Sequence, residues 1–584
     1  MSGMPPTADA VIVGGGPVGS LIAYQLARFG CTPYLIEQED KESAACYGRA
    51  TTLWPRTIEL LDQLDVAERL LQIGAVTRNG LHFRDGRRSH GGLMFGSRMD
   101  RLGDTYFKFA LHLRQRLTEQ QFTEALEEMG IQHHMRQRIE GFTIDESAED
   151  GYPVTVRARD LTQDKVVEIK TKYLIGADGG RSTVRSLAGI AFTSERTMHR
   201  WIRMDARVKT NMPNPRCLNS IDSKGHGQIL WCPIDNGLTR IGYVFSQALL
   251  EKYGGVEGVT QEVAVKEAIQ ALQPFQVEFI EVDWFTIYGI GQAIAETFCA
   301  QDRVFLAGDA CHTHSSGSAQ GLNTGVHDAV NLSWKLAVRS LCSLCARRLI
   351  DGPANSAESW QTDSHGLCAT SNRQRQSHQH AHLGPIPSSI PRPQGAPTRS
   401  PDRVVHGHER PAVHSWTRHI VPRLMIVVAT NIINSASSDP SAATIGPGER
   451  GPDVYLTTIG IVVFAGNPAL SRASLVALQT ALAAPTAFTR AFPARRVFRV
   501  ATLAAACGNG AADVLPILPG MRRAFGRVFW DPAGAAHGVY GVDEARGAVV
   551  VFRPDGCVGC VVALENVLDL GAYFAGFLVP EPGV

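Results

Sequence analysis

The N-terminal pattern of apolar and polar positions predicts a strand, a glycine turn, a helix and a second strand. Ala10 to Val13 is an apolar run, residues 14–19 are rich in glycine, and residues 20–29 carry apolar side chains at helical spacing. Pro33 to Glu37 is a further short apolar run. This order is that of the opening βαβ unit of a doubly wound parallel sheet.

The middle of the chain follows a different pattern. Between about residues 190 and 291 apolar and polar residues alternate, as in 228–232 and 239–245, which predicts an antiparallel sheet with one face toward a ligand. The apolar run at residues 303–307 predicts a short buried strand. Helices are expected over residues 56–71, 118–129 and 324–341.

The segment from about residue 350 to 422 breaks both patterns. It is rich in His, Pro, Ser, Gln and Arg and has almost no apolar period. Such a stretch cannot bury enough apolar surface to offset its ordering, so an exposed, irregular segment is expected there. An error in the gene prediction that replaces a helix is an alternative explanation. Short strands and helices resume from about residue 446.

Length, composition and charge narrow the class of protein. The 584 residues exceed what one hydrophobic core normally serves, so two or three domains are expected. A net charge of +1 gives no broad field that would favour nucleic acid or an anionic membrane surface. Twelve cysteines lack a disulfide framework spacing, and no secretory signal or membrane-spanning run is visible. A cytoplasmic protein without nucleic-acid or membrane partners is expected.

The glycine turn has the spacing of a dinucleotide-binding motif. Gly14 permits a tight turn, Gly16 lets the backbone approach a pyrophosphate, and Gly19 packs the helix on the strand. Glu37 ends the next strand, where its carboxylate can accept hydrogen bonds from a ribose. The alternative is a glycine turn unrelated to any ligand.

Two further motifs make the assignment specific. Residues 173–185 read Tyr-Leu-Ile-Gly-Ala-Asp-Gly-Gly-Arg-Ser-x-Val-Arg, and residues 303–312 read Arg-Val-Phe-Leu-Ala-Gly-Asp-Ala-Cys-His. With the glycine turn, and in this order, they resemble the class A flavoprotein monooxygenases, the family of para-hydroxybenzoate hydroxylase and phenol hydroxylase, over about residues 8–340. Residues 448–453 and 550–556 resemble the thioredoxin-like domain of phenol hydroxylases.

The resemblance implies an α/β fold with a Rossmann-like FAD-binding domain, an antiparallel substrate sheet and a C-terminal thioredoxin-like domain that allows a homodimer. The FAD-binding domain would comprise residues 8–75, 105–189 and 300–345. The substrate sheet would comprise residues 76–104 and 190–299. An irregular, disordered segment over 346–425 would precede the thioredoxin-like domain at 440–584.

The resemblance also implies which residues hold FAD. The ADP part would lie at Gly14, Gly16, Gly19 and Glu37, with Arg49 reaching the pyrophosphate and the flavin. Gln120 resembles the family glutamine at the start of the helix that lines FAD, and Asp178 is linked to both FAD and NAD(P)H. The remaining cofactor contacts would come from Gly308 and Asp309 at the ribityl chain and from Gly321, Leu322 and Asn323 at the flavin pyrimidine edge.

Simpler interpretations stand beside these. Asp178 and Asp309 are also residue types that turns and helix caps favour. His312, His314 and His327 suggest a metal, but no carboxylate or cysteine set has ligand spacing, so no metal is expected. Cys557 and Cys560 resemble a redox pair but lie in a late strand and turn, so a structural role is expected.

The family reaction would use NADPH or NADH to reduce FAD and dioxygen to form a flavin hydroperoxide, which hydroxylates a phenolic or related aromatic substrate. Tyr288 matches the tyrosine that reaches flavin and substrate in phenol hydroxylases, although a packed strand tyrosine is the alternative. Two positions depart from the family pattern, because Thr51 replaces the phenol-deprotonating acid and Ala293 replaces an arginine. Epoxidation, Baeyer–Villiger insertion, dehydrogenation on the same scaffold, or a catalytically impaired gene product are the other hypotheses.

Overall fold

The computed structural model describes two parts of the chain. The described residues are 6–41, 50–89, 105, 107–313 and 319–341, and then 459–467, 470–484, 487, 498–505, 527–531, 535–553 and 558–575. The expected irregular segment at 346–425 lies outside these residues, as do Arg49, His314 and Cys557. Across the described residues, no helix combines the length and the apolar character that crossing a membrane requires.

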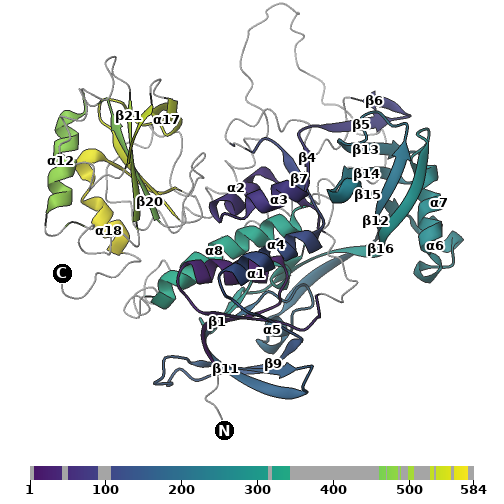
Figure 1. Cartoon of the computed structure of the whole chain (residues 1–584), viewed down its shortest axis with the longest axis horizontal. Helices are drawn as coiled ribbons and strands as arrows, with labels where there is room; N and C mark the ends of the chain where they lie inside the picture. Colours follow the sequence, from purple (N-terminus) through teal and green to yellow (C-terminus); the bar gives the residue numbers. More distant parts are fainter. Residues whose placement is uncertain are drawn as a thin grey trace, which may run out of the picture.

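The first sheet confirms the predicted doubly wound unit. Its main strand order is β17-β18-β11-β1-β2-β8, and β18, β11, β1, β2 and β8 run parallel (Figure 1). The strands are β1 (Thr7–Val13), β2 (Pro33–Glu37), β8 (His133–Met135), β11 (Lys165–Gly176), β17 (Cys299–Ala300) and β18 (Val304–Leu306). Antiparallel strands β9 (Gln137–Ile144) and β10 (Val154–Asp160) extend from β11.

Three helices lie together against this sheet (Figure 1). They are α1 (Pro17–Arg28), α4 (Gln115–Glu128) and α8 (Gly321–Leu341). The apolar faces of α1, α4 and α8 and the strand residues between them form one buried core, because parallel strands are apolar on both faces. The shorter elements nearby are α2 (Pro55–Gln63), α3 (Ala67–Ile73), α5 (Thr183–Leu187) and a small sheet of β3 (Thr52–Leu53), β4 (Ala75–Thr77) and β7 (Ala110–His112).

The predicted alternating region forms the second sheet, with strand order β19-β16-β12-β15-β14-β13-β5-β6. Its strands are β5 (Gly80–Arg84), β6 (Arg87–Ser89), β12 (Phe192–Thr210), β13 (Leu218–Ser223), β14 (Gly227–Pro233), β15 (Thr239–Phe245), β16 (Val277–Ala295) and β19 (His312–Thr313). Most pairs are antiparallel, and β13 with β5 is parallel.

The two faces of this second sheet differ. The apolar side chains of one face pack against α6 (Gln247–Lys252) and α7 (Gln261–Ala271). On this face the Tyr243 hydroxyl donates a 2.6 Å hydrogen bond to the Ala264 carbonyl of α7. The opposite face carries Cys232, whose Sγ lies 3.3 Å from Nδ1 of His112 in β7. This opposite face, hereafter the inner face, therefore lies against the FAD-domain side of the molecule.

The C-terminal residues form a separate mixed sheet with strand order β22-β21-β20-β23-β24. Its strands are β20 (Ile459–Gly466), β21 (Phe498–Ala505), β22 (Arg527–Asp531), β23 (Ala548–Phe552) and β24 (Val558–Ala563). Among its described residues the longest helix is α12 (Arg472–Ala483). Cys560 lies buried in β24, and burial raises the pKa of its thiol to about 12, which argues against an activated redox thiol. The thioredoxin-like assignment remains a prediction.

Candidate functional site

In the glycine turn between β1 and α1, two glycines are closely packed and a third faces open space. Gly14 has a φ of +104°, and a Cβ there would lie 2.4 Å from the Ala177 carbonyl oxygen. A Cβ on Gly19 would lie 1.9 Å from the Gly14 carbonyl oxygen. A Cβ on Gly16, which caps α1, would meet nothing within 4 Å. The first and third glycines are thus required by packing, whereas the second keeps room at a helix N-terminus, as a dinucleotide pyrophosphate requires.

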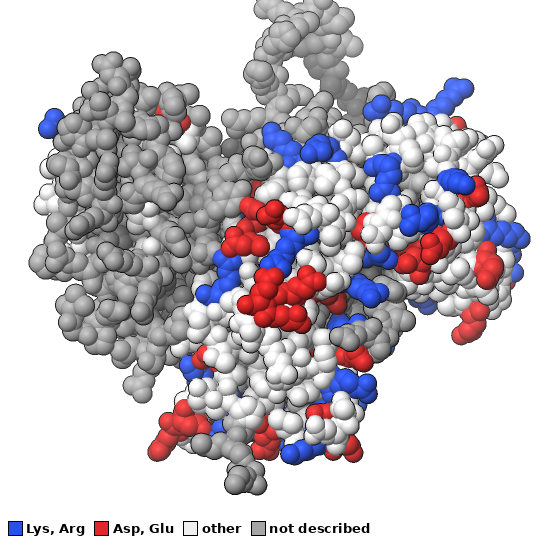
Figure 2. Space-filling model, in the orientation of Figure 1, with Lys and Arg blue, Asp and Glu red and all other residues white. Residues whose placement is uncertain are grey.

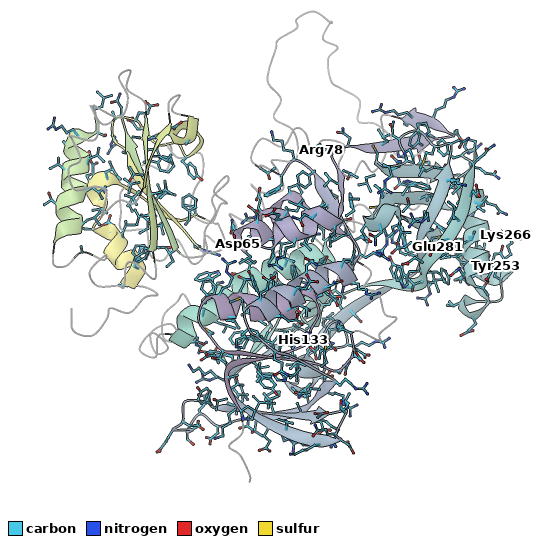
Figure 3. All side chains as sticks on the ribbon, in the orientation of Figure 1. Asp65, Arg78, His133, Tyr253, Lys266 and Glu281 are labelled. Carbon is cyan, nitrogen blue, oxygen red and sulfur yellow. The ribbon has the colours of Figure 1, made fainter. Side chains whose placement is uncertain are left out.

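Glu37 closes one side of this turn. Its Oε2 accepts a hydrogen bond of 2.8 Å from the Gly15 N–H, and its Oε1 accepts one of 2.9 Å from the Glu39 N–H. A carboxylate has about four lone-pair sites, so both oxygens keep capacity for ribose hydroxyls. His133 of β8 packs beside the turn (Figure 3), and burial lowers its pKa to about 4. The imidazole next to the turn is therefore neutral at pH 7.

Asp178 follows the end of β11 and serves a local purpose. Its carboxylate accepts hydrogen bonds from the Thr183 N–H at 2.7 Å and the Val184 N–H at 3.1 Å, so it caps α5. The cap interpretation accounts for these contacts, and a contact of Asp178 with FAD or NAD(P)H remains a prediction. Arg185, which sequence reasoning did not single out, donates to the Ala310 carbonyl at 2.7 Å and the Gly180 carbonyl at 3.0 Å. It ties the second motif to the third.

The third motif forms the turn after β18. Gly308 has a φ of +62°, and the neighbouring Asp309 is exposed on the short helix η4 (Gly308–Ala310). A Cβ built on Gly321 would lie 4.0 Å from Asp309 Oδ1, so the carboxylate lies at the start of α8. The Asp309 carboxylate is therefore an exposed group beside the N-terminus of α8.

Asp328 of α8 holds this turn from inside. It is 1% exposed and accepts a 3.0 Å hydrogen bond from the Gly308 N–H. His312 Nε2 lies 2.7 Å from the same carboxylate. Cys311, His312 and Asp328 bring their ligand atoms within 4.8 Å of one another, but the His312–Asp328 hydrogen bond and the bond to Gly308 explain the grouping without an ion. Asp328 was missed because its partner lies twenty residues earlier in the chain.

The N-terminus of α8 is joined to the loop after β3. Asn323 Nδ2 donates to the Thr52 carbonyl at 2.8 Å, and its Oδ1 accepts from the Trp54 N–H at 2.9 Å. Asn323 is buried and its side chain is occupied by these contacts, so the side chain is not available to a cofactor. Gly321 and Leu322 are partly exposed at the first turn of α8, where backbone N–H groups lack helical partners.

One expected cofactor residue lies later in its helix than predicted, and its contact with FAD remains a prediction. The prediction that Gln120 lies at the start of its helix is wrong, because α4 begins at Gln115. Gln120 is exposed in the second turn and donates to Glu124 at 2.9 Å. Gln115 occupies the helix start and accepts a 3.4 Å hydrogen bond from the Ala50 N–H. The polar character of the first turns of α4 concealed its beginning, since Leu117 is the only apolar residue before Phe122.

Tyr288 lies on the inner face of the second sheet. In the β12–β16 pair Tyr288 is opposite Trp201. Trp284, four residues earlier on the same strand, is opposite Asp205. Side chains of directly opposite residues share a face, and the alternation from 284 to 288 is unbroken. Thr51 is buried at the end of its loop and carries a hydroxyl instead of an acid.

Two ion pairs of Arg114 join the two domains at this face, and a third pair, between Arg240 and Asp205, lies within the second sheet. Arg114 Nη2 lies 2.7 Å from Asp235 Oδ1, and Arg114 Nη1 lies 2.6 Å from Asp283 Oδ2. Arg240 makes a two-pronged contact with Asp205 at 2.6 and 2.7 Å. On the outer surface, by contrast, acidic and basic side chains are interspersed over the visible face (Figure 2). Sequence reasoning missed these pairs because no local pattern marks them.

Comparison with known proteins agrees with the geometry. Residues 7–340 match the family model described as FAD binding domain, and residues 459–582 match the one described as phenol hydroxylase C-terminal dimerisation domain. The chain is 29% identical to 3-hydroxybenzoate 4-monooxygenase of Comamonas testosteroni over 59% of this chain and 56% of that protein. It is 26% identical to an FAD-dependent monooxygenase of Aspergillus terreus (strain NIH 2624 / FGSC A1156) over 98% of this chain and 85% of that protein.

This chain covers little more than half of the length of most of the curated relatives first matched. One example is an FAD-dependent monooxygenase of Aspergillus thermomutatus, of which it covers 56%. Among solved structures, aklavinone-11 hydroxylase in complex with FAD and aklavinone has a TM-score of 0.63 at 19% identity, covering 98% of this chain and 99% of that one. Anhydrotetracycline hydroxylase from Streptomyces rimosus has a TM-score of 0.58 at 19% identity, covering 98% and 100%. These structures support the fold.

Proposed function

The chain belongs to the family of flavoprotein monooxygenases that share this FAD-binding domain, and from that membership we propose that it hydroxylates a phenolic or related aromatic compound. The reductant is NADH or NADPH, and the oxidant is dioxygen. FAD is the resident cofactor.

One observation carries the proposal. Three separate motifs follow the carboxyl ends of three adjacent parallel strands, β18, β11 and β1. Ligands of open α/β sheets bind at this edge. The open space at Gly16 and the exposed carboxylate of Asp309 beside the N-terminus of α8 fit the two ends of an extended dinucleotide. The residues present therefore suit FAD.

When bound, the flavin supplies hydride acceptance and the activation of dioxygen. The chain's own residues would position the cofactor and stabilise its negative charge. Gly16 admits the pyrophosphate, Glu37 accepts from the ribose, and Asp309 accepts from the ribityl hydroxyls. The N-terminus of α8 at Gly321 stabilises negative charge on the pyrimidine edge, because its unpaired N–H groups point outward.

The substrate would lie between this edge and the inner face of the second sheet. Tyr288 is the group we expect at the substrate hydroxyl, which its phenol can orient by a hydrogen bond. Thr51 cannot take the substrate proton as a carboxylate would, so the chain has to ionise the phenol by other means or hydroxylate it as the neutral form.

The C-terminal domain, which we place at residues 440–584, would form a homodimer contact and leave the chemistry to the first two domains. Its match to a dimerisation domain supports this. Light scattering after size exclusion would give a mass of twice the 63.3 kDa chain, and a monomer would contradict the proposal.

The decisive experiment starts with purification of the full chain. A yellow protein with a flavin spectrum is expected. A panel of phenols should then stimulate NADH or NADPH oxidation, with a product heavier by one oxygen atom. Stimulated oxidation that yields only hydrogen peroxide, or a product without added oxygen, would contradict hydroxylation.

A further inference from the structure

Arg553 of the C-terminal domain contacts Trp334 of the FAD-binding domain. Arg553 comes directly after β23, and its guanidinium carbon lies 5.5 Å from the centre of the Trp334 ring in α8. A guanidinium within about 6 Å of an indole ring is attracted by the partial negative charge of the ring face. The contact therefore joins two domains that have separate hydrophobic cores.

The C-terminal domain holds this arginine in position. A Cβ on Gly559 of β24 would lie 3.3 Å from Arg553 Cγ and 2.2 Å from the Tyr573 hydroxyl oxygen. A glycine at this position leaves room for both side chains, so the stem of Arg553 lies against β24 beside Tyr573. In the sequence Arg553 opens the run Arg-Pro-Asp-Gly, and a proline disfavours helical backbone at the residue before it. The motif at residues 550–556 thus presents an arginine to α8.

The indole of Trp334 is held without a hydrogen bond. Its Nε1 is buried and has no hydrogen-bond acceptor among the described residues. Lys335 Nζ lies 5.8 Å from the same ring. The ring is therefore positioned by packing and by the two cations near it. A change of Trp334 disturbs the contacts of both cations, so the test below begins with Arg553.

Trp334 lies in the helix that organises the flavin end of the candidate FAD site. Six residues earlier, Asp328 accepts the 3.0 Å hydrogen bond from the Gly308 N–H, and α8 begins at Gly321. At a rise of 1.5 Å per residue, Trp334 lies about 9 Å from Asp328 and about 20 Å from Gly321 along the helix axis. Because a helix is a rigid element over this length, a contact that fixes Trp334 also limits where Asp328 and Gly321 lie.

We propose that Arg553 is a positioning residue through which the C-terminal domain holds α8 in the orientation that binds FAD. The C-terminal domain then supports cofactor binding within its own chain, in addition to forming a dimer contact. This inference rests on the proposed function, since it assumes that the flavin lies at the N-terminus of α8. It does not depend on which compound is hydroxylated.

The test measures FAD binding to the full-length apoprotein by fluorescence titration. Arg553→Met keeps the length of the side chain but removes its charge, and we expect the FAD dissociation constant to rise roughly threefold to tenfold. Arg553→Lys keeps a cation at the ring and should recover most of the affinity. Comparison of the two variants separates the charge of the side chain from the space that it fills.

The matched control is Arg546→Met, which changes an arginine of the same domain. The Arg546 side chain is 69% exposed and pairs with Glu565 at 3.0 Å. This variant loses the same charge at the surface of the domain, so it should bind FAD with wild-type affinity.

A double-mutant cycle tests whether Arg553 acts through Trp334. Trp334→Leu removes the ring from the other side of the contact and should itself weaken FAD binding. In that background Arg553→Met should cause less than about a twofold further change, because the contact is already lost. If the arginine served only the folding of its own domain, its replacement would weaken FAD binding equally in both backgrounds. That result would overturn the proposal.

Two further results would overturn it. One is an unchanged FAD affinity in Arg553→Met, and the other is an Arg553→Lys variant that binds FAD no better than Arg553→Met. Failure of the proposed function looks different, since the titration contains neither reductant nor substrate. A chain whose FAD affinity depends on Arg553 but that hydroxylates no phenol would refute the hydroxylase and leave the positioning role standing. Hydroxylation with unchanged FAD affinity in Arg553→Met would leave the enzyme standing and remove the positioning role.

Discussion

The backbone N–H of Gly308 and the carboxylate of Asp328 are joined by a 3.0 Å hydrogen bond that anchors the turn bearing Asp309 to α8. Asp328→Asn keeps the shape of the side chain but removes the negative charge that contacts His312 and the Gly308 N–H. We expect a loss of about 1.5–3 kcal/mol in unfolding free energy and weaker FAD binding. Urea unfolding and flavin titration measure both. Asp164→Asn, at a side chain that is 86% exposed, is the control that should change neither.

Asp309 tests the ribityl contact directly. Asp309→Ala removes the exposed carboxylate beside Gly321, at the start of α8. FAD binding should weaken by roughly 1–3 kcal/mol, since one acceptor is lost. Fluorescence titration of the apoprotein with FAD gives the dissociation constant. An unchanged constant would sink the assignment of Asp309 to the cofactor.

Two glycine substitutions separate packing from ligand approach. Gly14→Ala forces a Cβ to 2.4 Å from the Ala177 carbonyl at a φ of +104°, so the variant should fold poorly or not at all. Gly16→Ala meets nothing within 4 Å, so its unfolding temperature should match that of the ligand-free wild type while FAD binding falls. Full FAD affinity in a folded Gly16→Ala variant would show that the pyrophosphate lies elsewhere.

Tyr288→Phe removes one hydroxyl from the inner face. We expect the fraction of oxidised NAD(P)H that yields product to fall more than FAD affinity does, because the substrate loses its orienting hydrogen bond. The measurement compares NAD(P)H consumed with product formed. Equal coupling in the two proteins would favour a tyrosine that merely packs. A flavin more than about 8 Å from Tyr288 in a cofactor-bound structure would exclude direct or single-water contact.

The buried His112 leads us to expect that the folded state loses stability at acid pH. It is fully buried between the hydroxyls of Thr52 and Thr77, and burial, assisted by Arg216, lowers its pKa from 6.5 to about 3. The folded state therefore resists protonation, and stability falls as the pH drops from about 6.5 toward 3. One such group contributes a slope of at most ~1.4 kcal/mol per pH unit. Urea unfolding between pH 7 and 5 measures it, and His112→Gln should flatten the curve. An unchanged slope in that variant would contradict the assignment.

Local patterns predicted the cofactor-binding half of the fold well. The strand Pro33–Glu37 has the predicted bounds, because an apolar run between turn residues leaves little choice. The expected helix at 324–341 begins three residues earlier, at Gly321.

The polar contacts were beyond the reach of sequence. Arg114 and Asp235 are 121 residues apart, and which charges meet across two domains depends on tertiary packing. The same applies to Asp328, whose role depends on the Gly308 N–H and His312 that surround it. The start of the helix bearing Gln120 was predicted too late for a local reason, since α4 starts with polar residues and its N-cap, Arg114, makes no side-chain cap.

Strands β12 and β16 are each 19 residues long and pair with each other from Phe192 and Ala295 to Thr210 and Val277. A pair of that length extends for ~60 Å, although its register shifts at three places along the way. Ile294 near one end pairs with His312, the partner of Asp328. The same strand pair that carries Tyr288 is therefore tied at one end to the turn of Gly308. We expect a change at that turn to reach the wall facing the substrate through the backbone of β16.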